Sequence, residues 1–104
     1  MSIYTPLIIG PTTPEAAIAH FFAGREVAPP EGLELSPITA PEFLFGDDLA
    51  WAWKLTTGPA AGNNGVVIFK ADYNGWLAAE DTDNESDLTL VEYAMGGLEL
   101  GAIR

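Results

Sequence analysis

Apolar residues along this chain of 104 residues follow two different periods, and the change of period separates a helix from a sheet. Near the N-terminus, Ile18, Phe21 and Phe22 recur at the i, i+3, i+4 spacing of an amphipathic helix. Thr13 has the side chain of an N-cap residue, and Gly24 suits a left-handed stop. The pattern therefore predicts one short helix that begins after Thr13 and ends at Gly24.

From Phe43 onward the apolar positions change to the period of two that is typical of half-buried strands. The clearest run alternates Trp51 and Trp53 with small or polar residues. Asn74 and Gly75 separate two apolar runs and predict a hairpin with a type I′ turn, in which both residues take a positive φ. Strand segments are expected at residues 43–45, 49–56, 66–73, 76–79, 88–95 and 98–103.

The predicted order of elements indicates an α+β protein, with one short N-terminal helix packed on an antiparallel meander sheet of about five strands. Residues 1–104 are expected to form a single α+β domain, because this length is near the common domain size. Residues 26–41 contain four prolines and are expected to connect helix and sheet, with a short extended piece at 33–35. In architecture alone, this order resembles cystatin-like and NTF2-like domains.

Both faces of the expected sheet carry apolar side chains. Trp51 and Trp53 share one face of their strand, whereas Val66 and Val67 lie on opposite faces of the next strand. One short helix covers only one face, so either the proline-rich segment or a second subunit must cover the other. Of these two alternatives we expect the second subunit, and hence a homodimer, because monomers rarely expose a large apolar face.

The negative charge of the chain limits the classes of partner that it can bind. Fifteen Asp and Glu residues stand against four Lys and Arg residues, which gives a formal net charge of −11. Direct nucleic-acid binding is not expected, because affinity for phosphates comes mainly from Lys and Arg. Anionic membrane surfaces are disfavoured for the same reason. A basic protein is the expected partner, although an acidic, salt-adapted proteome would produce the same charge without functional meaning.

The densest acidic stretch places Asp81, Asp83, Glu85 and Asp87 at alternate positions, with Glu92 at the twelfth place counted from the first of them. This spacing is similar to that of a calcium-binding EF-hand loop. The sixth place is a serine where the turn needs glycine, and no flanking helix is expected, so no metal site is predicted. The simplest interpretation is a hydrated loop, and its four alternating carboxylates are the predicted contact with a basic partner.

Several catalytic chemistries are excluded by composition. Cysteine is absent, which removes disulfides, thiolate catalysis and cysteine-based zinc sites. His20 is the only histidine, and none of the three serines lies in a Gly-x-Ser-x-Gly elbow. Asp47 and Asp48 lie in a predicted turn, where hydrogen bonds to the local backbone explain them most simply. No catalytic residue and no cofactor are assigned.

A second candidate site is a ligand pocket formed by Trp51, Trp53, Asp72 and Trp76, although aromatic residues at strand spacing more often belong to the core. Three functions stay open. The first, which we prefer, is a non-enzymatic acidic interaction module that binds a basic protein surface, as a small phage-type inhibitor or nucleic-acid mimic does. The second is a cystatin-like or NTF2-like ligand-binding domain or enzyme with a Trp-lined pocket. The third is a structural or assembly subunit.

The chain start has no basic residue and only three consecutive aliphatic residues, so no signal peptide is expected. No apolar run in the chain approaches the ~20 residues that cross a membrane, so no membrane span is expected. We expect a soluble protein of the cytoplasm.

Overall fold

The computed structural model describes residues 3–4, 8–9, 13–23, 31–39, 42–58 and 61–100. Its elements in chain order are β1 (Ile3–Tyr4), β2 (Ile8–Ile9), α1 (Pro14–Ala23), β3 (Glu31–Pro37), β4 (Leu49–Thr57), β5 (Asn64–Lys70), the 3₁₀ turn η1 (Ala71–Tyr73), β6 (Gly75–Glu80) and α2 (Asp87–Leu100).

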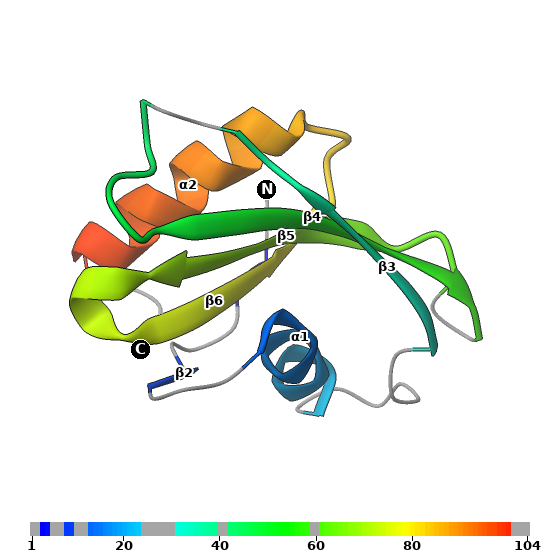
Figure 1. The fold of residues 1–104 in the computed structure, drawn as a ribbon. Coiled ribbons are helices and arrows are strands. Elements are labelled where there is room, and N and C mark those ends of the chain that lie inside the picture. Colours follow the sequence, from blue (N-terminus) through cyan, green and yellow to red (C-terminus); the bar gives the residue numbers. More distant parts are fainter. Residues whose placement is uncertain are drawn as a thin grey trace.

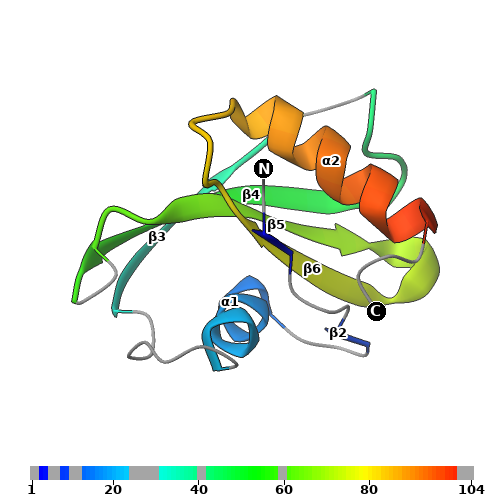
Figure 2. The ribbon, with the colours of Figure 1, turned by 180° about the vertical axis from the view of Figure 1, so that it is seen from behind.

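One antiparallel sheet lies between the two helices, with α1 on one face and α2 on the other (Figure 1). The same three layers are seen from behind in Figure 2. Strands β3, β4, β5 and β6 form a meander in which each strand pairs with the next, and the two-residue strands β1 and β2 pair with the other edge of β6. The predicted α+β class is confirmed, with a meander of four strands in place of about five.

Helix α1 forms where the sequence predicts it. Its N-terminus is capped by Thr13, whose Oγ1 accepts a backbone N–H of the first turn at 3.2 Å. Ile18, Phe21 and Phe22 are at most 4% exposed, so the predicted apolar stripe is the face that packs on the sheet. The predicted stop, Gly24, lies outside the described residues.

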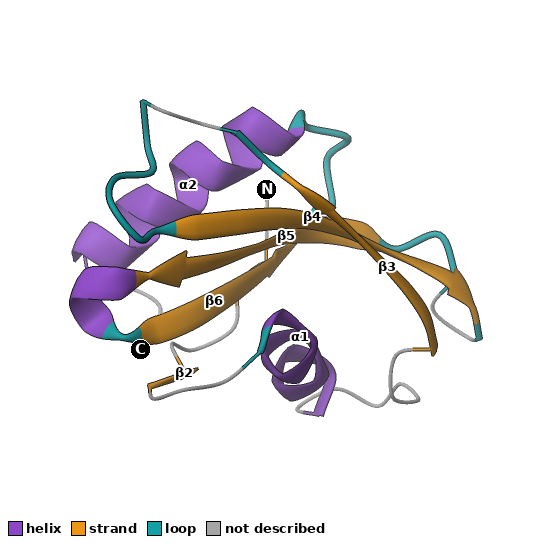
Figure 3. Ribbon diagram, in the orientation of Figure 1, coloured by secondary structure: helices purple, strands orange, loops and turns teal. Residues whose placement is uncertain are grey.

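The segment predicted as a strand at residues 88–95 is a helix, α2, and that prediction is wrong (Figure 3). Leu90, Val91 and Ala94 are fully buried, which is the i, i+1, i+4 spacing of a helix face. In a strand, Glu92 would interrupt the apolar side that contains Leu90. Packing of this stripe on the sheet therefore overrides the strand preference of the β-branched residues in the segment.

Two further predictions fail with that strand. The tight turn expected at Gly96-Gly97 lies inside α2, and the strand expected at 98–103 begins within the same helix, with residues 101–104 outside the described part. The short strand expected at 43–45 is a loop. No helix within the described ranges is long and apolar enough to cross a membrane.

The hairpin between β5 and β6 is confirmed, but its turn differs from the predicted two-residue loop. Strand β5 ends at Lys70, which pairs with Gly75, and η1 bridges the two strands. Asn74 has the left-handed φ of 47°, whereas Gly75 is already the first residue of β6. Asp48 accepts the backbone N–H of Ala71 at 3.0 Å, so a residue from outside the hairpin stabilises the longer turn.

Helix α2 removes the reason for expecting a second subunit. Val66 and Val67 do lie on opposite faces of β5, as predicted, and each face has its own helix. The core on the α2 face contains the buried residues Ala50, Val66, Ile68, Leu77, Ala79, Leu90, Val91 and Ala94. The core on the α1 face contains Ala17, Ile18, Phe21, Phe22, Trp53, Leu55, Val67, Trp76 and Ala78.

Part of the segment expected to connect helix and sheet is strand β3. The extended piece predicted at 33–35 is confirmed, and it is longer than predicted because β3 spans Glu31–Pro37, of which six residues pair with β4. Both helices pack on β5 and β6, which leaves the β3 side of the sheet with less cover.

Candidate interaction surface

The acidic loop that follows β6 is held in one conformation by its own hydrogen bonds. The backbone N–H of Asp81 donates to the carbonyl oxygen of Asn64 at 2.8 Å, which ties the loop to β5. The Asp81 carboxylate in turn accepts the backbone N–H groups of Asp83 and Glu85, both at 3.1 Å. Asn84 takes a φ of 56°, a conformation that asparagine tolerates better than most residues. One carboxylate therefore organises the turn.

The end of the loop is the N-cap of α2. Ser86 Oγ accepts the backbone N–H of Thr89 at 3.2 Å and shares a hydrogen bond of 2.8 Å with its hydroxyl group. Asp87 lies in the first turn of the helix, where the dipole stabilises a negative charge. Asp83 and Asp87 are exposed, whereas Asp81 and Glu85 are half-buried. The structure thus brings the four predicted contact residues together, with the Asp81 side chain used inside the loop.

The resemblance of this loop to a calcium site rests on spacing alone. A helix does follow the loop, contrary to our expectation, but the Asp81 Oδ1 atom already accepts two N–H groups. Within the described ranges, no group of three or more His, Cys, Asp or Glu residues is arranged to hold a metal ion.

Beside the loop lies a hollow of about 220 Å³, and five of the seven residues that line it are polar. It was not predicted from the sequence, because the strand pairing decides which residues meet there. The alternation of side chains along β3 and β4 does put their small and polar residues on the face opposite the leucines and tryptophans. That alternation is visible in the sequence and could have identified about half of the lining. The residues that line the hollow are Glu34, Ser36, Ala52, Trp53, Lys54, Asn64 and Asp87.

The lysines of the described chain differ in their environments. The Nζ atom of Lys70 lies 2.7 Å from Asp48 Oδ2, and the two side chains are 14% and 4% exposed. Lys54 is exposed and lies in the hollow, directly across the β3–β4 ladder from Glu34. Because Lys70 is engaged internally, it does little to offset the carboxylates at the surface.

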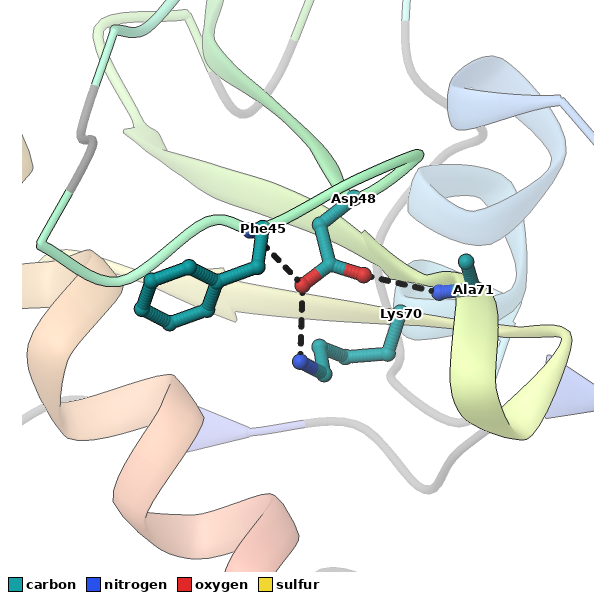
Figure 4. Close-up of polar contacts among 4 residues, drawn as sticks. All are labelled: Phe45, Asp48, Lys70 and Ala71. Carbon is teal, nitrogen blue, oxygen red and sulfur yellow. Dashed lines mark hydrogen bonds and ion pairs between the residues drawn. The ribbon is translucent and has the colours of Figure 1, made fainter.

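Asp48 has a structural role at the opposite end of the strands (Figure 4). Its Oδ2 accepts hydrogen bonds from Lys70 Nζ at 2.7 Å and from the Phe45 N–H at 3.2 Å, and its Oδ1 accepts the Ala71 N–H at 3.0 Å. Burial alone raises the pKa of this carboxyl group, but the hydrogen bonds from Lys70, Ala71 and Phe45 outweigh it and lower the pKa below its usual value. Asp47 beside it is exposed.

Of the residues in the second candidate site, Trp53 lines the hollow, whereas Trp51, Asp72 and Trp76 do not. Trp53 and Trp76 are 1% and 5% exposed in the core under α1, and Trp51 stacks on Trp76 with ring centroids 5.6 Å apart. The Trp53 Nε1–H donates to the Val66 carbonyl oxygen at 3.1 Å, which satisfies its polar atom inside the core. Asp72 is exposed on η1. This arrangement gives the tryptophans a packing role.

No family model, no curated protein and no solved structure matches this chain. The architectural resemblance to cystatin-like and NTF2-like domains therefore gains no support from known structures, and the function has to be inferred from the surface just described.

Proposed function

We propose that this protein is a non-enzymatic acidic interaction module that binds a basic protein surface. The observation that carries the proposal is the fixed loop at residues 81–87, which its own hydrogen bonds hold in place while Asp83 and Asp87 stay exposed. A loop that is already ordered loses little conformational entropy when it binds. Its carboxylates are therefore pre-organised for Lys and Arg side chains of a partner.

The net charge supports the same proposal at longer range. A charge of −11 on a small domain attracts cationic partners before contact and accelerates association. This attraction is screened over about 8 Å at physiological ionic strength, so binding should weaken steeply with salt. A partner whose basic surface normally contacts phosphates would meet carboxylates in their place. The finer form of the proposal is accordingly an inhibitor that competes with nucleic acid.

The test uses a fluorescein-labelled oligoarginine peptide as the probe and fluorescence anisotropy as the measurement. The loop variant carries Asp83→Asn, Glu85→Gln and Asp87→Asn and keeps Asp81, because that carboxylate orders the loop. At about 50 mM salt we expect the loop variant to bind about ten-fold more weakly than the unmodified protein, and at about 300 mM salt the difference should shrink.

A matched control removes the same number of charges at the other end of the sheet. It carries Glu42→Gln, Asp47→Asn and Asp72→Asn, all exposed positions that lie in the loop before β4 or on η1. The proposal requires this variant to bind less than about three-fold more weakly than the unmodified protein. Equal losses in the two variants, or no binding at low salt, would show that the charge does not act through the loop.

A further inference from the structure

Strand β3 forms the outer edge of the sheet among the described strands. The sheet order is β1-β6-β5-β4-β3, so β3 pairs with β4 on one side. An edge strand presents backbone N–H and C=O groups that can pair with an additional strand. The same strand contributes Glu34 and Ser36 to the hollow beside the acidic loop. The edge and the acidic surface are therefore contiguous.

The register shows which backbone groups of β3 point away from β4. The N–H of Ile38 donates to the carbonyl oxygen of Ala50 at 3.0 Å, in line with the pairing of the preceding residues. Hydrogen-bonded and non-hydrogen-bonded pairs alternate along an antiparallel ladder. Glu34 therefore directs its backbone groups toward β4, whereas Leu33 and Leu35 direct theirs outward.

Pro37, at the end of β3, fits this register. It falls in the same alternate set as Leu33 and Leu35, so the N–H that proline lacks would have pointed outward. The ladder with β4 consequently loses no bond at this position. The outward-directed groups include the N–H and C=O of Leu33 and Leu35 and the C=O of Pro37.

The two faces of β3 differ in chemistry. Leu33 and Leu35 are half-buried against the core on the α1 face, whereas Glu34 and Ser36 are exposed on the face of the hollow. Asp87 lines the same hollow from the start of α2. A strand added to β3 would thus place alternate side chains beside leucines on one face and beside Glu34, whose neighbour in β4 is Lys54, on the other.

We propose that β3 takes up an extended segment of the basic partner as a further strand of the sheet, with Lys or Arg alternating with apolar residues. The inference rests on the proposed function and adds the form of the partner to it. When a peptide binds as an added strand, main-chain hydrogen bonds supply its affinity and every second side chain supplies its specificity. A second copy of this chain is a poor occupant, because Glu34 would face an equally acidic edge.

The test compares two labelled peptides of about eight residues with the same composition. In one, lysine and valine alternate, and in the other the lysines and the valines form two blocks. Both carry the same charge, so a general electrostatic attraction binds them equally. We expect the alternating peptide to bind about ten-fold more tightly, because only it can place its lysines on one face of a strand.

Two variants of the protein then identify the edge. Leu35→Pro removes an outward N–H and leaves the ladder with β4 intact, whereas Leu35→Ala shortens the same side chain and keeps the N–H. Leu35→Pro should abolish the preference for the alternating peptide, and Leu35→Ala should retain it.

Equal binding of the two peptides, lost in the loop variant, would overturn the inference and leave the proposed function intact. If neither peptide nor oligoarginine binds, both fail.

Hydrogen exchange keeps the inference testable if Leu35→Pro does not fold. In the unmodified protein, adding the alternating peptide should slow amide exchange at Leu33 and Leu35, and it should change Glu34 little because that amide already pairs with β4. No added protection at the two leucines overturns the inference. Light scattering that shows a dimer without peptide, joined through β3 and lost in Leu35→Pro, would also overturn it, because the occupant would then be a second copy.

Discussion

Strands β6 and β3 belong to one sheet, but only β6 is buried. All six residues of β6 are buried, including the carboxylate residue Glu80, whereas each β3 side chain that the structure describes is half-buried or exposed. The difference follows from the helices, which both pack on β5 and β6 (Figures 1 and 2). One half of the sheet is thus enclosed between helices, and the other half presents an edge and a hollow.

This division suggests that stability and recognition depend on different halves of the molecule. Buried apolar contacts supply most of the free energy of folding, so substitutions in the enclosed half should be costly. Substitutions in the β3 half should change binding more than stability. The predictions below test the division with matched substitutions.

The largest effect is expected at the contact of α2 with the sheet. Leu90 is fully buried in the core of the α2 face, and Leu90→Ala should lower the free energy of unfolding by about 3 kcal/mol. Leu88 is 47% exposed, and Leu88→Ala should cost less than about 0.5 kcal/mol. Urea unfolding monitored by tryptophan fluorescence measures both values.

This pair also distinguishes the helix from the strand that the sequence predicted. Residues two apart lie on the same face of a strand but about 200° apart around a helix. Similar costs for Leu88→Ala and Leu90→Ala would therefore contradict the helix and restore the strand.

The sequence predicted α1 and the Trp-containing strand well because local and tertiary preferences agree there. Thr13 caps the N-terminus of α1, and the spacing of Ile18 and Phe22 matches the helix face that packs on the sheet. In α2 the two preferences conflict, because Thr89 and Val91 favour a strand locally. Ser86 is a typical N-cap residue, but it stands within the run of alternating carboxylates that predicts a hydrated loop.

The candidate surface was predictable only in part, for a related reason. Composition alone identified the acidic loop. The hollow depends on Glu34 facing Lys54 across the ladder, and on Asn64 and Asp87 meeting from distant parts of the chain. Alternation fixes the face on which a side chain lies, but not its neighbour in the next strand. Pairing register is therefore the information that the sequence lacked.

A smaller effect, and one that depends on pH, is expected at Asp48. Replacing it by asparagine leaves the Lys70 ammonium group without its carboxylate in a mostly buried position, and Asp48→Asn should cost about 2 kcal/mol at pH 7. The exposed neighbour is the control, and Asp47→Asn should cost less than about 0.5 kcal/mol.

The sign of the pH dependence follows from the lowered pKa of Asp48. A carboxyl group with a lowered pKa in the folded state adds stability above its unfolded pKa of about 3.9. That stability is lost as the pH falls through the folded pKa. The difference in unfolding free energy between the unmodified protein and Asp48→Asn should therefore be constant near neutral pH and shrink below about pH 4. A constant difference down to pH 2 would contradict the role assigned to this ion pair.

The smallest effects come from one substitution made in each half of the sheet. Glu80 is buried at the end of β6 and accepts a hydrogen bond from Asn63 Nδ2 at 2.9 Å, so Glu80→Gln should cost about 1 kcal/mol. Glu34 is exposed on β3, and Glu34→Gln should change stability by less than about 0.5 kcal/mol. Urea unfolding at pH 7 measures both variants, which carry the same charge change.

If Glu34→Gln costs as much as Glu80→Gln, the β3 half contributes to stability as the enclosed half does. If Glu34→Gln leaves stability unchanged but weakens binding of the alternating lysine–valine peptide, this carboxylate acts in recognition and not in folding.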